Sequence, residues 1–282
     1  MTTTPEILRY SAFAATPEGG NPAGVVLDAD GVDETRMQRI AAEVGYAETA
    51  FATPVPGAPG HHRVRYWSPA AEVPFCGHAT VATAVALAER DGAGTVVFET
   101  AAGSISMESF ADADGRVTVS FTSVEPQVRD LDVRVRDRLL DLLGLVPSDL
   151  DPRFPARESF AGNWHPILVI ADREVFHQFR FSPPEVAALM REQGWLGTVT
   201  VLYGEDPADL EARNLFPVGR ITEDPATGSA AASTGAYLRA QGFPGTSVRI
   251  RQGRHVWRPS ELLVAIPETG GIVVSGGATP IS

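Results

Sequence analysis

The chain has 282 residues, enough for one large domain or two of ordinary size, and either would bury a substantial hydrophobic core. Its formal net charge of −12 argues against nucleic acid and anionic membranes as partners, because no basic face can easily collect on such a chain. Its single cysteine, Cys76, excludes an internal disulfide framework and a cysteine-rich metal site.

Targeting and membrane segments are not visible in the sequence. Residues 1–20 lack a basic stretch followed by an apolar run, and no apolar run reaches the roughly 18 residues that a membrane helix needs. We therefore expect neither a secretory signal nor a membrane span, and the cytoplasm is the expected compartment.

The first half of the chain predicts strands, a helix, a glycine turn and a second helix. Asp33 is typical of an N-cap, and Met37, Ile40 and Val44 fall on one face of the helix that would follow, which Gly45 would end. Alternating or apolar runs predict strands at 7–14, 23–27, 64–67, 95–100, 104–110 and 116–122, with a short extended piece at 46–51.

The second half repeats this order. Residues 126–134 are interpreted as the crossing between halves, 135–143 as a helix and 147–157 as a loop. Ser182-Pro183-Pro184-Glu185 predicts a helix start with Ser182 as N-cap and Glu185 closing a capping box. Further strands are predicted at 166–171, 198–203, 212–216, 248–251, 261–266 and 271–275.

This recurring order predicts an α+β fold of two pseudo-symmetric halves, each a curved, mostly antiparallel sheet wrapped around a central helix. We place the halves at residues 1–124 and 125–282, with the last strand, 271–282, a candidate to complete the first half.

Two segments far apart in the chain match in register. Glu72-Val73-Pro74-Phe75-Cys76-Gly77-His78-Ala79 and Glu223-Asp224-Pro225-Ala226-Thr227-Gly228-Ser229-Ala230 share the Glu, the Pro, the Gly and the final Ala. Each leads into a run of small and apolar residues, which predicts an enclosed helix. A helix N-terminus presents unpaired N–H groups and the positive end of the dipole, so each turn is a candidate anion site. If the two turns face each other, they make one site that holds a carboxylate.

Four side chains could carry chemistry. Glu48 sits among apolar neighbours, which would raise its pKa and suit a general acid/base, although a solvated loop glutamate is the alternative. His78 and Asp224 flank the two turns and could handle a proton or bind substrate, or else serve as helix-end residues. Cys76 is a candidate acid/base or a small buried residue, and Thr227 at its partner position precludes a two-thiol mechanism.

Other groups are given no catalytic role. His61 and His62 lie in a Gly/Pro-rich segment and are expected to be solvated, and His165 is expected to cap a strand entry or line a cleft. No ligand spacing typical of a metal site occurs, so no metal is predicted. The glycine turns lack the spacings of nucleotide-binding loops, so no nucleotide cofactor is predicted either.

Five blocks in order, spanning nearly the whole chain, resemble the phenazine-biosynthesis isomerase (PhzF-like) family of the diaminopimelate-epimerase-like superfamily. The blocks are Gly20-Asn21-Pro22-Ala23-Gly24-Val25-Val26, Glu48-Thr49-Ala50-Phe51, Phe75-Cys76-Gly77-His78-Ala79-Thr80, Glu223-Asp224-Pro225-Ala226-Thr227-Gly228-Ser229-Ala230 and Arg258-Pro259-Ser260.

The resemblance implies a cleft between two halves, a homodimer and no cofactor. The best-understood member isomerises trans-2,3-dihydro-3-hydroxyanthranilate by moving a proton between carbons. By resemblance, Glu48 is the catalytic acid/base, and His78 and Asp224 are its binding and proton-handling partners. The amides of the two glycine turns form the carboxylate clamp. The implied substrate-binding positions are Asn21, Cys76, Gly77, Gly228 and Ser229.

One departure separates this chain from both branches of the resemblance. Cys76 stands where the phenazine enzyme has Ala and where epimerase relatives have one thiol base, while Thr227 replaces the other thiol.

The first functional hypothesis is therefore a cofactor-independent isomerase that shifts a proton on a small carboxylic acid. The second is an epimerase or racemase with Glu48 and Cys76 as unlike bases. The third is a non-catalytic protein that binds a small anion.

Overall fold

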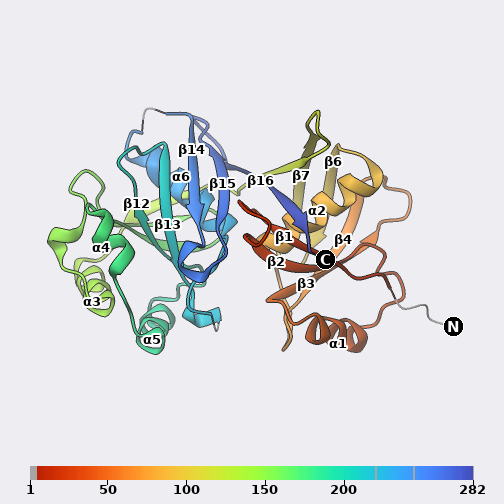
Figure 1. The fold of residues 1–282 in the computed structure, drawn as a ribbon, viewed down its shortest axis with the longest axis horizontal. Coiled ribbons are helices and arrows are strands. Elements are labelled where there is room, and N and C mark those ends of the chain that lie inside the picture. Colours follow the sequence, from red (N-terminus) through yellow and green to blue (C-terminus); the bar gives the residue numbers. More distant parts are fainter. Residues whose placement is uncertain (1–4, 220, 244, 282) are drawn as a thin grey trace. The chain divides into compact units, whose positions relative to one another are not determined.

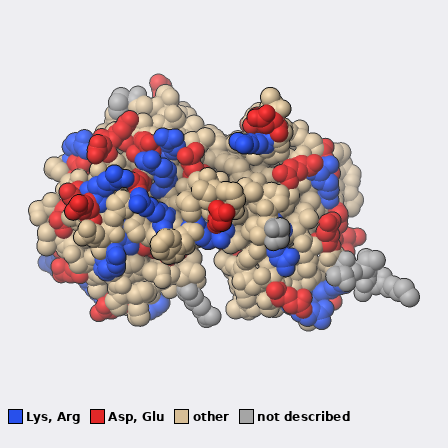
Figure 2. Space-filling view, viewed as in Figure 1, with Lys and Arg blue, Asp and Glu red and all other residues tan. Residues whose placement is uncertain are grey.

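The computed structural model describes residues 5–219, 221–243 and 245–281, and the chain divides into two compact units. The first unit comprises the described residues up to Thr122 and from Ser275 onward, and the second comprises Ser123–Val274. In each unit, Figure 2 shows acidic and basic side chains interspersed over the visible face. No helix of the described residues is both long enough and apolar enough to cross a membrane.

The first unit is a closed sheet (Figure 1). The strands in spatial order are β1 (Leu8–Ala12), β2 (Asn21–Val26), β3 (Glu48–Pro54), β4 (His61–Trp67), β6 (Thr95–Thr100), β7 (Gly103–Ala111) and β8 (Val117–Thr122). Strand β16 (Val273–Pro280) lies between β8 and β1 and so closes the sheet, and the short β5 (Glu72–Val73) pairs with β4. The pairs β2–β3 and β4–β6 are parallel, because a helix or long connection joins them.

Helix α2 (Gly77–Asp91) fills the interior of this sheet. Every residue from His78 to Ala88 is buried, and the helix packs against β1, β2, β3, β7 and β8. The small side chains on all its faces let the strands approach from every side, while Val85 and Leu87 each contribute about 1.5–3 kcal/mol by burial. The predicted enclosed helix is confirmed.

Helix α1 (Glu34–Val44) covers the outside of the same sheet. The Asp33 carboxylate accepts the amide of Arg36, and Gly45 ends the helix in the left-handed conformation with φ 74°, as the sequence predicts. Its buried face packs on a cluster that includes Phe51 of β3. The helix end therefore delivers the chain directly to the first residue of β3.

The second unit has the same plan with more helices on its outside. Its strands in spatial order are β15 (Ser260–Ala265), β14 (Ser247–Gln252), β13 (Asp209–Leu215), β12 (Val199–Tyr203), β11 (Trp164–Val169), β10 (Arg157–Phe160) and β9 (Gln127–Asp130). Its enclosed helix is α6 (Gly228–Ala240), which packs against β9, β10, β11, β14 and β15. The remaining helices are α3 (Val133–Leu143), α4 (Arg173–Gln178) and α5 (Pro183–Gln193), with 3-10 turns η1 (Pro147–Asp149), η2 (Pro217–Gly219) and η3 (Arg254–Val256).

Close packing of α6 explains a glycine inside the helix. A Cβ atom at Gly235 would lie 2.8 Å from side-chain carbons of both Ile272 and Val264. Glycine costs helix stability, so its presence here reflects the close approach of the strands. The predicted α+β fold, with a mostly antiparallel sheet around a central helix in each half, is confirmed.

Three predictions of local structure are corrected, and one helix has no counterpart among the predictions. The capping box at Ser182 does not form, because the amide of Glu185 donates to the carbonyl oxygen of Ser182 (3.1 Å) and the Ser182 side chain makes no cap bond. The segment 126–134 contains strand β9, the end of the loop at 147–157 enters β10, and α4 was not anticipated. These elements are only four to six residues long, and β9 is largely exposed, so they show no periodicity.

His62 is also corrected, because it is buried rather than solvated. It belongs to β4, where it pairs in register with Phe98 of β6 and meets the Phe98 ring edge-on, with 6.2 Å between ring centroids. Burial lowers the pKa of His62 below its usual value.

Candidate functional site

Three predicted side chains of the first unit meet at the start of α2. The Cys76 thiol donates to Glu48 Oε2 (3.3 Å), and His78 Nε2 lies 3.3 Å from the same oxygen. The Cys76 sulfur is 3.4 Å from His78 Nδ1 and 3.7 Å from Nε2. Cys76 is 7% exposed, and the side chains of His78 and Glu48 are 8% and 22% exposed. A carboxylate, a thiol and an imidazole are therefore in mutual contact, with the carboxylate the most accessible of the three.

The local fold places this trio. Glu48 is the first residue of β3, immediately after the turn that ends α1, and it pairs in register with Ala23 of the parallel strand β2. Asn21 is buried as the first residue of β2, so it lies at the same end of these two strands as Glu48. Gly24 permits the close pairing, since a Cβ there would lie 2.6 Å from the Thr49 hydroxyl.

The N-termini of both enclosed helices lack a side-chain cap. Cys76 is the N-cap of α2 and makes no cap hydrogen bond, so the first-turn amides from Gly77 onward are not taken by it. Thr227 is the N-cap of α6 and likewise makes none, because its hydroxyl donates to Asp224 Oδ2 (2.5 Å). Amides left without a side-chain cap can bind an anion, which is what the sequence predicts for each turn.

The turn before α6 is held from several directions. Gln252 of β14 donates through Nε2 to the Asp224 carbonyl oxygen (2.6 Å) and to the Thr227 hydroxyl (3.0 Å). The Asp224 amide donates to the Asn214 carbonyl oxygen (2.8 Å). Asp224, Gly228 and Ser229 are thus brought together in the second unit on a fixed turn.

The glutamates that open the two matching segments both bind an arginine. Glu72 pairs with Arg65 of β4 (2.6 Å), and Glu223 pairs with Arg213 of β13 (2.6 Å). The first pair is partly exposed, whereas the second is almost fully buried. The shared glutamate therefore anchors each turn to the strand beside it, a structural role that its place in the repeat did not reveal.

His165 of β11 supports Ser229 and was not recognised as part of the site. His165 Nδ1 lies 3.0 Å from the Thr198 amide nitrogen, 3.1 Å from its carbonyl oxygen and 3.0 Å from its hydroxyl oxygen. His165 Nε2 lies 3.1 Å from Ser229 Oγ, so the imidazole joins β11 to the first turn of α6. Ser229 lies 64 residues beyond His165, so no local pattern could have indicated the contact.

Burial lowers the pKa of His165 to about 4, and this shift predicts a pH dependence of stability. The unfolded chain protonates this imidazole near pH 6.5, whereas the folded protein holds it neutral down to about pH 4. The unfolded state therefore binds more protons in this window, and the stabilisation present above about pH 6.5 is lost as the pH falls toward 4, by about 3 kcal/mol in total. The free energy of unfolding, measured by urea denaturation at several pH values across this window, should depend less steeply on pH in His165→Gln than in wild type. An equal pH dependence in the two proteins would show that His165 is not its source.

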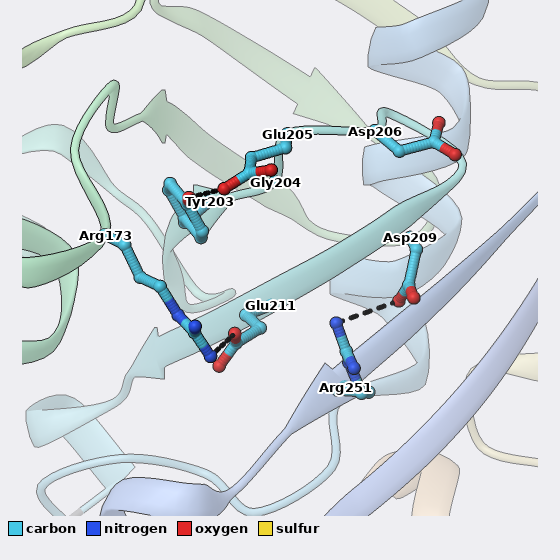
Figure 3. A pocket seen from close by; sticks show the side chains of 8 residues that line it. All are labelled: Arg173, Tyr203, Gly204, Glu205, Asp206, Asp209, Glu211 and Arg251. Carbon is cyan, nitrogen blue, oxygen red and sulfur yellow. Dashed lines mark hydrogen bonds and ion pairs between the residues drawn. The ribbon is translucent and has the colours of Figure 1, made fainter.

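A separate cavity in the second unit contains none of the predicted site residues (Figure 3). Its lining is charged, and the charges pair within it: Arg173 with Glu211 (3.5 Å) and Arg251 with Asp209 (3.2 Å). Tyr203 donates to Glu205 (3.2 Å) in the same lining. Because these groups satisfy one another, the cavity offers less chemistry than the turns at the helix starts.

Comparison with known proteins agrees with this architecture. A family model described as phenazine biosynthesis-like protein matches residues 10–282. An uncharacterized isomerase of Deinococcus radiodurans is 34% identical over 281 residues, covering 95% of this chain and 89% of the relative. An uncharacterized isomerase of Bacillus subtilis is 30% identical over 277 residues, covering 95% and 92%. The crystal structure of the Bacillus anthracis phenazine biosynthesis protein, PhzF family, matches with a TM-score of 0.85 at 27% identity, covering 100% of this chain and 98% of that one.

These likenesses place the fold in the diaminopimelate-epimerase-like class that the sequence predicts. The chain belongs to the phenazine biosynthesis-like (PhzF) family, as its five sequence blocks indicate.

Proposed function

We propose that this protein is a cofactor-independent isomerase that shifts a proton on a small carboxylic acid, in the manner of trans-2,3-dihydro-3-hydroxyanthranilate isomerase. The observation that carries the proposal is the Glu48 carboxylate in contact with both Cys76 and His78 at an uncapped helix N-terminus. Relatives that match nearly the whole chain are named isomerases, which supports the same reaction type.

In the proposed reaction, Glu48 removes a proton from a carbon next to an unsaturated system. The C–H electron pair becomes a new double bond, the old double bond shifts its pair to another carbon, and that carbon receives a proton from the conjugate acid. The negative charge that develops on the substrate is stabilised by the first-turn amides of α2. His78 orients the Glu48 carboxylate and can pass the proton onward.

In the second unit, the turn before α6 is proposed by itself as a binding site for a small carboxylic acid. The Ser229 hydroxyl and the first-turn amides of α6 are the groups of this turn that can donate to a carboxylate. Asp224 accepts from Thr227 and is suited to accept from an amino or hydroxyl group of the substrate as well.

Geometry disfavours the two-base epimerase. Bases on opposite faces of one carbon, each about 3–3.5 Å from it, would stand roughly 6–7 Å apart. Cys76 Sγ and Glu48 Oε2 are instead in direct contact at 3.3 Å. The trio therefore favours one working base with two partners. The third hypothesis, a non-catalytic anion-binding protein, receives no support from the named relatives.

The proposal is tested by proton NMR of the enzyme in D₂O with trans-2,3-dihydro-3-hydroxyanthranilate and a panel of small carboxylic acids. We expect deuterium at carbon together with migration of a double bond in at least one acid. Exchange at a stereocentre with loss of configuration would instead establish an epimerase. Acids that bind without any exchange would overturn the catalytic proposal.

A further inference from the structure

We propose that Glu48, Cys76 and His78 form a three-ligand site for a divalent ion of the zinc type, and that an ion bound there blocks proton transfer. The sequence showed no metal-ligand spacing, because the carboxylate lies 28 residues before the thiol and comes from a different element. Each of the three residues offers one ligand atom, and these three atoms all lie within 4.8 Å of one another. Among the described residues, no other three His, Cys, Asp or Glu side chains meet this condition.

The three ligand atoms already have the separations that zinc requires. Tetrahedral zinc binds sulfur at about 2.3 Å, nitrogen at about 2.0–2.1 Å and carboxylate oxygen at about 2.0–2.2 Å, so its ligand atoms stand roughly 3.4–3.6 Å apart. The corresponding separations here are 3.3 Å between Glu48 Oε2 and Cys76 Sγ, 3.3 Å between Oε2 and His78 Nε2, and 3.7 Å between Sγ and Nε2. Shifts of a few tenths of an ångström would complete one face of the tetrahedron.

The kinds of donor select the ion. A thiolate and an imidazole favour zinc, cobalt or copper over magnesium and calcium, which prefer oxygen ligands alone. Cys76 is the N-cap of the buried helix α2 and His78 lies in its first turn, so their positions are fixed by the fold. Three protein ligands leave a fourth position for water or for the carboxylate of a substrate.

Metal binding would compete with the proposed function at the same atoms. The Cys76 thiol would release its proton to solvent and coordinate as the thiolate, while Glu48 Oε2 would give its lone pair to the metal. Glu48 could then not accept a proton from substrate. Inhibition by zinc rests on the proposed function, whereas binding of the ion does not.

The test uses cobalt(II) as a spectroscopic probe on the full chain without an affinity tag. Because Cys76 is the only cysteine, a thiolate-to-cobalt charge-transfer band reports this site alone. We expect the band to saturate at one equivalent of cobalt and to disappear when zinc is added. Cys76→Ser should remove the band, and His78→Gln should weaken cobalt binding at least about tenfold. Circular dichroism verifies that both variants remain folded.

A matched control is His61→Gln, a histidine on β4 outside the trio, which should leave the band unchanged. No charge-transfer band in folded wild type, or binding that is unaltered by Cys76→Ser, would overturn the site. If the band forms but zinc does not slow exchange on an accepted substrate, the site stands and its inhibitory role falls. If the band forms and no acid is turned over, the proposed function fails while the metal site stands.

Discussion

Replacing Glu48 by glutamine should lower the rate of proton transfer by about 10²–10⁴-fold, or about 3–5.5 kcal/mol in activation free energy. The amide has the size of the carboxylate and keeps a polar contact with the Cys76 thiol and the His78 ring, but it cannot accept a proton. Deuterium incorporation from D₂O into an accepted acid measures the effect directly, and the affinity for that acid should change much less.

Glu43→Gln is a matched control, since it makes the same change of charge on the exposed face of α1, five residues earlier in the chain. It should exchange deuterium at the wild-type rate. Exchange by Glu48→Gln within a few-fold of wild type would remove Glu48 as the base and make Cys76→Ala the next variant to measure. Loss of activity in both variants would indicate a general effect of charge.

The elements that could be predicted from sequence are those whose signal is local. Helix α1 carries its cap, its apolar face and its terminating glycine within the thirteen residues from Asp33 to Gly45, and the structure reproduces all three. Helix α2 has small or apolar residues on every face, and such a helix is stable only where other elements bury it on all sides. By contrast, β9 is a short, largely exposed strand at the edge of the second sheet, and β10 has only four residues, of which the two buried ones are the polar Glu158 and Ser159. Neither strand shows an alternation of apolar side chains.

The candidate site could be predicted residue by residue but not as a set of contacts. The sequence offers Glu48, Cys76 and His78 as separate candidates, because their mutual contact depends on β3 and α2 being folded against each other. The part played by His165 depends on two partners, 33 and 64 residues further along the chain. Sequence patterns describe residues that are close together in the chain, so they do not predict contacts between residues this far apart.

Arg213→Met should lower the free energy of unfolding by about 3–5 kcal/mol. The Arg213 and Glu223 side chains are only 4% and 6% exposed, and their closest approach is 2.6 Å. Arg213 also donates to the carbonyl oxygens of Phe176 and Phe179, each at 3.1 Å. Methionine fills similar volume but leaves the Glu223 carboxylate buried without its cation, and the cost of that charge dominates the change. Equilibrium unfolding in urea measures it.

Arg65→Met is the matched control, because Arg65 pairs with the equivalent glutamate of the first unit, Glu72, but in a partly exposed setting. Solvent screens that pair, so its loss should cost about 1 kcal/mol or less. The double variant Arg213→Met/Glu223→Gln should recover part of the lost stability, since it removes the buried charge. If Arg213→Met cost no more than Arg65→Met, burial would not govern the strength of these anchors. If the double variant were as unstable as Arg213→Met, the effect would belong to the two carbonyl contacts. Both variants lose those contacts, whereas only the single variant keeps an unpaired buried carboxylate.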